Sequence, residues 1–269
     1  MRDTSRPLPF LPAARAVFDL SLEGMIWTRR SLLMGVLVAI PVAFALLYRL
    51  VLVTKAAVRP VTPQDLYAVI VALYWIRNVL PLAALFYATA LIADEVEGRT
   101  LTYLTTRPLT RASIFAGKFA AYVATTFSLA LPAGVLTFFL LMSAPGSSGL
   151  GPAVGDLFRD LGVMALTLVA YGAFFALLGV LLKRPVIPGL LFLYGWELLA
   201  NLPGYLPRVT LTAWLRSLIH HRPAEEGLAG LFQQVLPAGE SLAVLVGVAV
   251  VCLAAASWIF SNREYVLEQ

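Results

Sequence analysis

The chain has almost no cysteine and few charged residues. Cys252 is the only cysteine in 269 residues, which excludes an internal disulfide, a cysteine-based zinc site and a dithiol redox pair. Charged residues make up 13% of the chain, whereas a typical soluble domain has about 25%. So few charges leave too little polar surface to surround an apolar core, and an ordinary soluble domain is therefore excluded.

The first 30 residues lack a long apolar run. A cleavable signal peptide has its apolar stretch close to the N-terminus, so we expect none here and predict that the first apolar run is an uncleaved anchor. That run begins only after eight charged residues, which are Arg2, Asp3, Arg6, Arg15, Asp19, Glu23, Arg29 and Arg30.

Long apolar blocks are abundant. Apolar residues make up 60% of the chain, and its mean hydropathy is +0.84. A helix needs about 20 apolar residues to cross the hydrocarbon of a bilayer, and the blocks predict six such helices in an all-α membrane protein. The fifth is the shortest and contains Glu197 and Asn201. The predicted spans are residues 32–53, 66–93, 119–142, 161–182, 186–202 and 242–260.

The distribution of Lys and Arg predicts the orientation, because cytoplasmic loops carry an excess of these residues. With a cytoplasmic N-terminus, twelve lie inside: Arg2, Arg6, Arg15, Arg29, Arg30, Arg99, Arg107, Arg111, Lys118, Lys183, Arg184 and Arg263. Seven lie outside: Arg49, Lys55, Arg59, Arg159, Arg208, Arg216 and Arg222. We therefore predict a multi-pass protein of the cell (plasma or inner) membrane with both termini in the cytoplasm. Because the basic residues lie beside spans, the net charge of +5 requires no nucleic-acid partner.

Three segments outside the predicted spans have distinctive patterns. Residues 13–30 place Arg15, Asp19 and Glu23 four residues apart, which predicts an amphipathic helix along the cytoplasmic interface; an ordinary juxtamembrane tether is the alternative. Residues 143–155 are rich in Gly, Ser and Pro and predict a short external loop. Residues 203–239 predict an external amphipathic or re-entrant helix through the apolar residues Leu211, Trp214, Leu215, Leu218 and Ile219. The expected organisation is a cytoplasmic N-terminus (1–30), a transmembrane domain (31–262) and a cytoplasmic tail (263–269).

The segment between the second and third predicted spans, residues 94–118, has the most informative polar pattern. Three acidic residues leave the second span, and a glycine then ends its helix. Thr100 stands where it can cap a short helix that carries Leu101 and Leu104 on one side. Pro108 ends that helix, and Thr110 can cap the helix of the third span. The pattern therefore predicts a short amphipathic cytoplasmic helix against which a motor domain can push.

This segment resembles the signature of the ABC-2 family of ABC exporter permeases. That signature runs acidic–x–x–Gly–Thr–Leu–x–x–Leu–x–x–x–Pro–x–x–Arg and is followed by Gly-Lys. The matching residues are Glu95, Glu97, Gly98, Thr100, Leu101, Leu104, Pro108, Arg111, Gly117 and Lys118. Arg99, between the glycine and the threonine, departs from the pattern. The six-span plan, the amphipathic N-terminus and the long loop before the last span also resemble the family.

The resemblance implies a half-transporter. Two permease chains, as a homodimer or a related heterodimer, would form the substrate pathway within the lipid bilayer. Each would be coupled to a separate cytoplasmic ABC ATPase that binds ATP and Mg, while the permease is non-catalytic and holds no cofactor. The sequence agrees, because Gly117-Lys118 is followed by Phe119 and forms no P-loop. The implied ATPase-coupling residues are Glu95, Glu97, Gly98, Thr100, Leu101, Leu104, Arg107, Pro108, Arg111 and Lys118.

Arg77 and Glu197 are ionisable residues inside predicted spans. A lone charge is costly there, and it usually pairs with another charge or faces water. One interpretation is that the two residues meet between helices or line a polar pathway. The other is that Arg77 extends its side chain to the outer interface.

Two other classes of function stand beside the exporter. A membrane-embedded enzyme would use His220, His221 or Glu197, but no nucleophile and base converge with them. Adjacent histidines do not face the same way on a helix, so we predict no metal site. A structural or assembly subunit, moved by an ATPase without carrying solute, is consistent with the same coupling motif.

Overall fold

The computed structural model describes residues 9–26, 28–54, 61–91, 110–147, 149–202, 204–219 and 236–262. Within these ranges all regular structure is helical, as the composition predicts. Five helices of the described part are long and apolar enough to cross a membrane, and they lie at Arg30–Val53, Pro63–Ala88, Arg111–Met142, Ala153–Leu181 and Ala238–Asn262.

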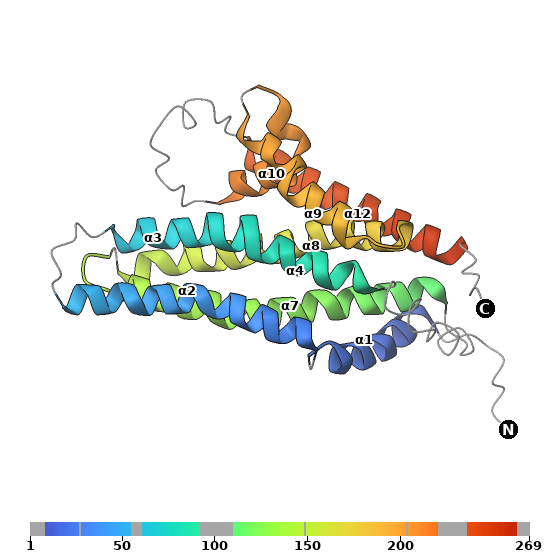
Figure 1. Cartoon of the computed structure of the whole chain (residues 1–269), viewed down its shortest axis with the longest axis horizontal. Coiled ribbons are helices and arrows are strands. Elements are labelled where there is room, and N and C mark those ends of the chain that lie inside the picture. The colour runs from blue at the N-terminus through green and yellow to red at the C-terminus, as the bar shows by residue number, and fades with distance from the viewer. Residues whose placement is uncertain are drawn as a thin grey trace.

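The helical elements in chain order are α1 (Phe10–Ile26), α2 (Arg29–Val53), α3 (Pro63–Val69), η1 (Ile70–Val79), α4 (Leu80–Ala88), α7 (Arg111–Met142), α8 (Leu150–Leu181), α9 (Val186–Tyr194), η2 (Trp196–Asn201), η3 (Leu206–Val209), α10 (Leu211–Leu218) and α12 (Ala238–Asn262). The second span is continuous through α3, η1 and α4. It runs alongside α2, α7 and α8, while α10 packs against α8 and α12 at the side of this bundle (Figure 1). α1 and the last turn of α12 lie at the end of the bundle where α7 begins (Figure 1).

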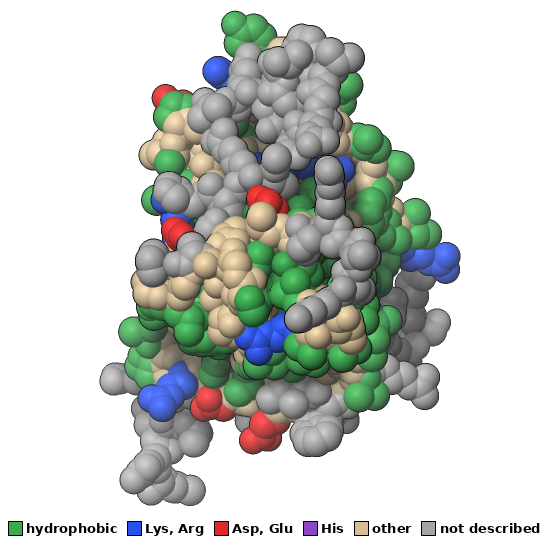
Figure 2. All heavy atoms as spheres, turned by 90° about the vertical axis from the view of Figure 1, so that its left-hand side faces the viewer, with side chains coloured by type: hydrophobic (Ala, Val, Ile, Leu, Met, Phe, Trp, Pro, Cys, Tyr) green, Lys and Arg blue, Asp and Glu red, His purple; other side chains and the backbone are tan. Residues whose placement is uncertain are grey.

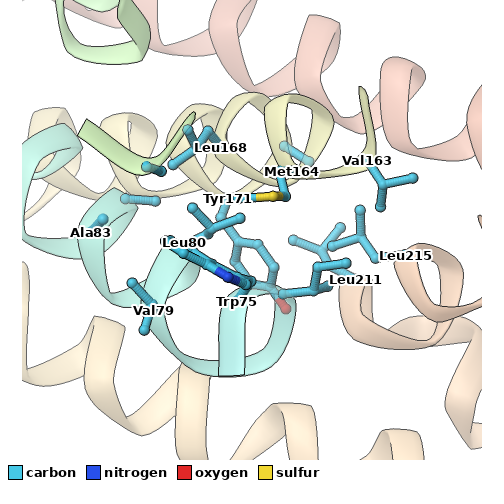
Figure 3. Packing of buried hydrophobic residues seen from close by; sticks show 14 of the residues in the cluster. Trp75, Val79, Leu80, Ala83, Val163, Met164, Leu168, Tyr171, Leu211 and Leu215 are labelled. Carbon is cyan, nitrogen blue, oxygen red and sulfur yellow. The ribbon is translucent and has the colours of Figure 1, made fainter. Parts of the chain in front are cut away.

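Two spans form the interior of the bundle. Most residues in the apolar stretches of Pro63–Ala88 and Ala153–Leu181 are buried (61% and 67%), against 17% in Arg30–Val53 and in Ala238–Asn262. The centre of the core lies where the second span, α8 and α10 meet. Figure 3 shows it with Trp75, Leu80, Met164, Leu168, Tyr171, Leu211 and Leu215.

The outer faces of α2 and α12 are apolar and exposed. Their exposed side chains include Leu32, Val36, Phe44, Val250 and Trp258. Figure 2 views the molecule from the left-hand side of Figure 1 and shows hydrophobic side chains over part of that end, among other side chains and a few charged groups. An apolar surface this extensive has no place in water, and contact with lipid accounts for it.

Threonine side chains cap four of the described helices. The Oγ1 atoms of Thr28, Thr62, Thr110 and Thr210 accept hydrogen bonds from the backbone N–H three residues later, at 3.3, 3.2, 3.3 and 3.4 Å. Each bond satisfies one of the N–H groups that a first turn leaves without a helical partner. The predicted cap at Thr110 is confirmed.

The middle of the second span is a π-helix, η1, that ends just before Pro81. Proline has no N–H, and its ring collides with the carbonyl four residues earlier in a regular α-helix, which here belongs to Arg77. The wider π turns avoid that collision. The Leu80 N–H bonds to the Trp75 carbonyl, five residues back, and Asn78 Nδ2 donates to the Leu73 carbonyl at 2.6 Å.

The long helices extend beyond the predicted apolar spans. α7 begins at Arg111, eight residues before the predicted span 119–142, because the Thr110 cap sets its start. The predicted loop 143–155 is too long, since α8 already begins at Leu150. The chain reverses within seven residues there, with Gly146 and Gly149 at φ 86° and 87°, a region that glycine enters without strain.

The fifth predicted span, 186–202, corresponds to α9 and η2. This apolar segment, Val186–Asn201, is shorter than the five long helices of the described chain. Its α-helical part ends at Tyr194, and a tighter 3-10 turn carries Glu197. The count of six spans therefore stays a prediction.

Candidate functional site

The predicted coupling segment lies largely outside the described residues. That holds for Glu95, Glu97, Gly98, Thr100, Leu101, Leu104, Arg107 and Pro108. Its last part, with Arg111, Gly117 and Lys118, forms the start of α7. We call these three residues and the groups they contact the α7 junction.

Arg111 connects the start of α7 to the end of α12. Its Nη1 atom donates to the carbonyl oxygens of Phe260 and Ser261 at 3.4 and 3.3 Å. These carbonyls belong to the last turn of α12, where a helix has no N–H partners for its oxygens and carries partial negative charge. A guanidinium group provides both N–H donors for these oxygens and a positive charge opposite the partial negative charge. Behind it, the rings of Phe115 and Phe260 are 6.5 Å apart.

Gly117 allows α1 to pack directly on α7. A Cβ atom at this position would overlap the Ala14 carbonyl oxygen and lie 2.9 Å from Val17 Cβ. Only glycine therefore permits this approach. The contact buries Ala13 and Val17 of α1.

The polar residues of α1 lie on its exposed side. Arg15, Asp19 and Glu23 are all exposed, as expected from their four-residue spacing. The helix occupies residues 10–26 rather than the predicted 13–30. It ends before Thr28, which caps α2.

Lys118 connects α7 to the end of the second span. Its side chain is only 7% exposed, and its Nζ donates to the Leu91 carbonyl oxygen at 3.2 Å. A buried ammonium group requires such polar contacts. Lys118, Gly117 and Arg111 thus contact three different segments: Leu91 after the second span, the middle of α1 and the last turn of α12.

The α7 junction is suited to holding helices together. Its contacts are one close backbone approach and three hydrogen bonds from cations to backbone carbonyl oxygens. No group of three or more His, Cys, Asp or Glu that can hold a metal occurs in the described part of the chain. His220 and His221 lie outside it.

Glu197, a residue of η2, contacts the start of α10. Its side chain is 1% exposed, and its Oε1 and Oε2 atoms accept hydrogen bonds from the backbone N–H groups of Leu211 and Thr212 at 3.1 and 3.0 Å. A carboxylate is favourable at a helix N-terminus, where N–H groups are unpaired and the dipole is positive. Glu197 therefore fixes α10 against η2.

Arg77 lies in the π-helix and faces the same region. Its Nη1 atom is buried and finds no hydrogen-bond partner among the described residues. Both Arg77 and Glu197 lie near Tyr171, whose hydroxyl is 2.9 Å from Thr212 Oγ1. The carboxylate oxygens of Glu197 accept their hydrogen bonds from α10. Arg77 and Glu197 therefore share surroundings, and a direct pair between them stays a prediction.

Sequence reasoning missed several polar groups of the interior. Asp160 is 1% exposed in α8, and both Asp160 and Asp156 lie near the buried Tyr67. The predicted span 161–182 placed Asp160 just outside the membrane. The four-residue spacing of Asp156 and Asp160 puts both on one helix face, but both residues fall between the expected loop 143–155 and the predicted span 161–182. Tyr171 and Thr212 have no sequence signal that separates them from other core residues.

Comparison with known families assigns the chain. A family model described as ABC-2 family transporter protein matches residues 26–265. No curated protein matches the chain. The matched region contains the five long helices and Arg111, Gly117 and Lys118, while almost all of α1 precedes it. The chain is a multi-pass membrane protein that belongs to the ABC-2 family of transporter proteins.

Proposed function

We propose that the chain is the permease subunit of an ATP-driven exporter of the ABC-2 type. The observation that carries the proposal is the α7 junction, which contains the last residues of the coupling motif and contacts α1, the second span and α12. ATP and Mg bind to a separate cytoplasmic ATPase, and this chain contributes no catalytic residue. A second permease chain, identical or related, completes the substrate pathway.

The length of α7 supports a role in transmitting movement. Its 32 residues correspond to about 48 Å at 1.5 Å per residue, which exceeds the roughly 30 Å hydrocarbon core. The turns that carry Arg111 and Lys118 therefore extend beyond or to the edge of the hydrocarbon. A displacement of the preceding segment acts on α7 and, through the α7 junction, on α1, the second span and α12 together.

The proposal also assigns a place in the membrane to each of the other helices. The five long helices and the shorter segment of α9 and η2 make six membrane segments, with α1 at the cytoplasmic interface and η3 and α10 forming an external re-entrant element. Both termini are cytoplasmic in this arrangement, in the plasma or inner membrane. The exposed faces of α2 and α12 are available to lipid and to the second permease chain.

The decisive experiment removes the proposed contact with the ATPase. Leu101→Asp combined with Leu104→Asp places two charges where an apolar groove of the motor would bind. A few central apolar side chains dominate most interfaces, so we expect a folded membrane protein that no longer co-purifies with its ATPase. Transport-coupled ATP hydrolysis in lipid vesicles is expected to fall to the uncoupled level. Intact association and coupling would contradict the proposal.

The control must lie away from the coupling segment and on the surface. Leu215 is unsuitable because it is 0% exposed, and a charge there would disturb the core. Val209, at the end of η3, is 55% exposed. Val209→Asp is therefore expected to leave association with the ATPase unchanged.

A further inference from the structure

Two adjoining cavities lie at the end of the bundle where α2 begins. We propose that together they bind one phospholipid with an anionic headgroup, taken from the leaflet that faces this end of the bundle. The polar cavity would hold the phosphate, and the apolar groove would hold the upper part of an acyl chain. The proposal concerns lipid binding and does not depend on the ATPase.

The polar cavity lies between α1, the start of α2, the end of the second span and α7. It has a volume of about 270 Å³, and its polar lining groups come from Ser21, Thr28, Arg30, Tyr87 and Lys118. The Tyr87 hydroxyl is 2.7 Å from Ser31 Oγ, so this side of the cavity already carries a hydrogen-bonded network. The cavity is thus roomy and lined by groups that bind phosphate oxygens.

The apolar groove begins where the polar cavity ends. It runs between α2 and α4, has a volume of about 230 Å³, and is lined by Leu33, Leu37, Leu82 and Phe86 among others. Arg30 and Tyr87 line both cavities, so the two cavities adjoin at these residues. Leu33 is 55% exposed, so the groove opens to the lipid-facing surface of α2.

The order of polarity along the two cavities is that of a phospholipid. Arg30 is the first residue of the span Arg30–Val53, so the charged cavity lies at the level of the headgroups. Leu33 and Leu37 lie one and two turns further along α2, about 4.5 and 10.5 Å deeper along the helix axis. A headgroup in the first cavity therefore directs its acyl chain into the second.

The charge of the polar cavity selects an anionic occupant. Its described lining carries the two cations Arg30 and Lys118 and no acidic side chain. The nearby acids of α1, Asp19 and Glu23, are exposed and do not line it. A guanidinium has five N–H donors and an ammonium three, so each can bind a phosphate oxygen in addition to its protein partners. Basic pockets between membrane helices are known to recognise lipid headgroups in this way.

The test measures binding of defined lipids to the full-length chain by native mass spectrometry in detergent. Phosphatidylglycerol and phosphatidylcholine with identical acyl chains are titrated separately. We expect one phosphatidylglycerol to bind at least about tenfold more tightly than phosphatidylcholine, since each basic residue near a headgroup contributes about fivefold. Millimolar glycerol 3-phosphate, which lacks acyl chains, should not displace the bound lipid.

Three variants locate the site. Arg30→Gln and Lys118→Gln are each expected to weaken phosphatidylglycerol binding about fivefold and to leave phosphatidylcholine binding unchanged. Arg30 is exposed, so Arg30→Gln tests the site even if the buried Lys118 variant fails to fold. Lys183→Gln combined with Arg184→Gln is the matched control, because both residues are exposed in the turn between α8 and α9 at the same end of the bundle. This control should retain the full preference.

Several results would overturn the proposal. Equal binding of the two lipids would mean that the cations are already neutralised, for example by the acidic residues 94–97 that follow Leu91 in sequence. An unchanged preference in Arg30→Gln, or an equal loss in the Lys183 and Arg184 control, would place any anionic lipid elsewhere. Displacement by glycerol 3-phosphate would show that the apolar groove contributes nothing.

Discussion

Single charged side chains at helix ends recur in this protein. Glu197 accepts bonds from the first N–H groups of α10, while Arg111 donates to carbonyl oxygens in the last turn of α12. In both cases the sign of the charge opposes the dipole of the helix end that it contacts. Charges that are costly in an apolar bundle are thereby used where the helices themselves leave polar groups unpaired.

We predict that Glu197→Gln destabilises the protein by about 1–3 kcal/mol, because an amide keeps one acceptor and loses the charge. Thermal unfolding of the purified chain would measure the loss. Hydrogen exchange at the amides of Leu211 and Thr212 should also accelerate. Glu240→Gln, in the exposed first turn of α12, is the matched control and should change little.

Arg77 provides the second half of this test. If its charge acts on Glu197 across Tyr171, the cost of Glu197→Gln should be smaller in an Arg77→Gln background. Coupled residues typically give interaction energies of about 0.5–3 kcal/mol in a double-mutant cycle. Strictly additive costs would instead favour the interpretation in which Arg77 extends to the outer interface.

At the scale of whole elements, α1 depends on one glycine of another helix. We predict that Gly117→Val separates α1 from α7, since overpacking of this kind costs about 1–3 kcal/mol. Faster hydrogen exchange and easier proteolysis within Phe10–Ile26 would report the separation. A Cβ atom added at Gly247 of α12 would meet nothing within 4 Å, so Gly247→Val should leave α1 unchanged. Unaltered protection of α1 in Gly117→Val would show that this close approach is dispensable.

Hydropathy predicts the position of a helix well where the bilayer thickness determines its length. It predicts helix starts less well where polar contacts determine them. The five long helices coincide with predicted spans because each needs an apolar length set by the bilayer. α7 and α8 begin earlier than predicted, since a threonine cap and a glycine turn determine their first residues. The π-helix before Pro81 and the short α9 follow from tertiary packing and backbone geometry, which periodicity does not report.

The sequence motif names residues of the α7 junction but not the groups that they contact. The motif identified Arg111, Gly117 and Lys118 as a group, and the family match contains them. Their partners at Phe260, Leu91 and Ala14 lie at distant or unpatterned positions of the sequence. No local pattern marks a backbone carbonyl as a partner, so the contacts themselves required the structure.

For the whole molecule, the orientation is the prediction with the widest consequences. The excess of basic residues on one side predicts that position 107 is cytoplasmic and position 147 is external. Arg107→Cys and Ser147→Cys, each in a Cys252→Ala background, can be labelled in right-side-out cells with an impermeant thiol reagent. We expect labelling at position 147 only. Labelling at 107 without labelling at 147 would reverse the proposed topology.

The π-helix also determines how the two halves of the second span are rotated relative to each other. Each residue of an α-helix advances the side-chain direction by about 100°, and η1 winds its ten residues through fewer turns than an α-helix would. The angular phase of α3, which turns Tyr67 toward Phe138 at 5.4 Å between ring centroids, is therefore offset from that of α4. A change in the winding of η1 would therefore rotate one half of the span against the other.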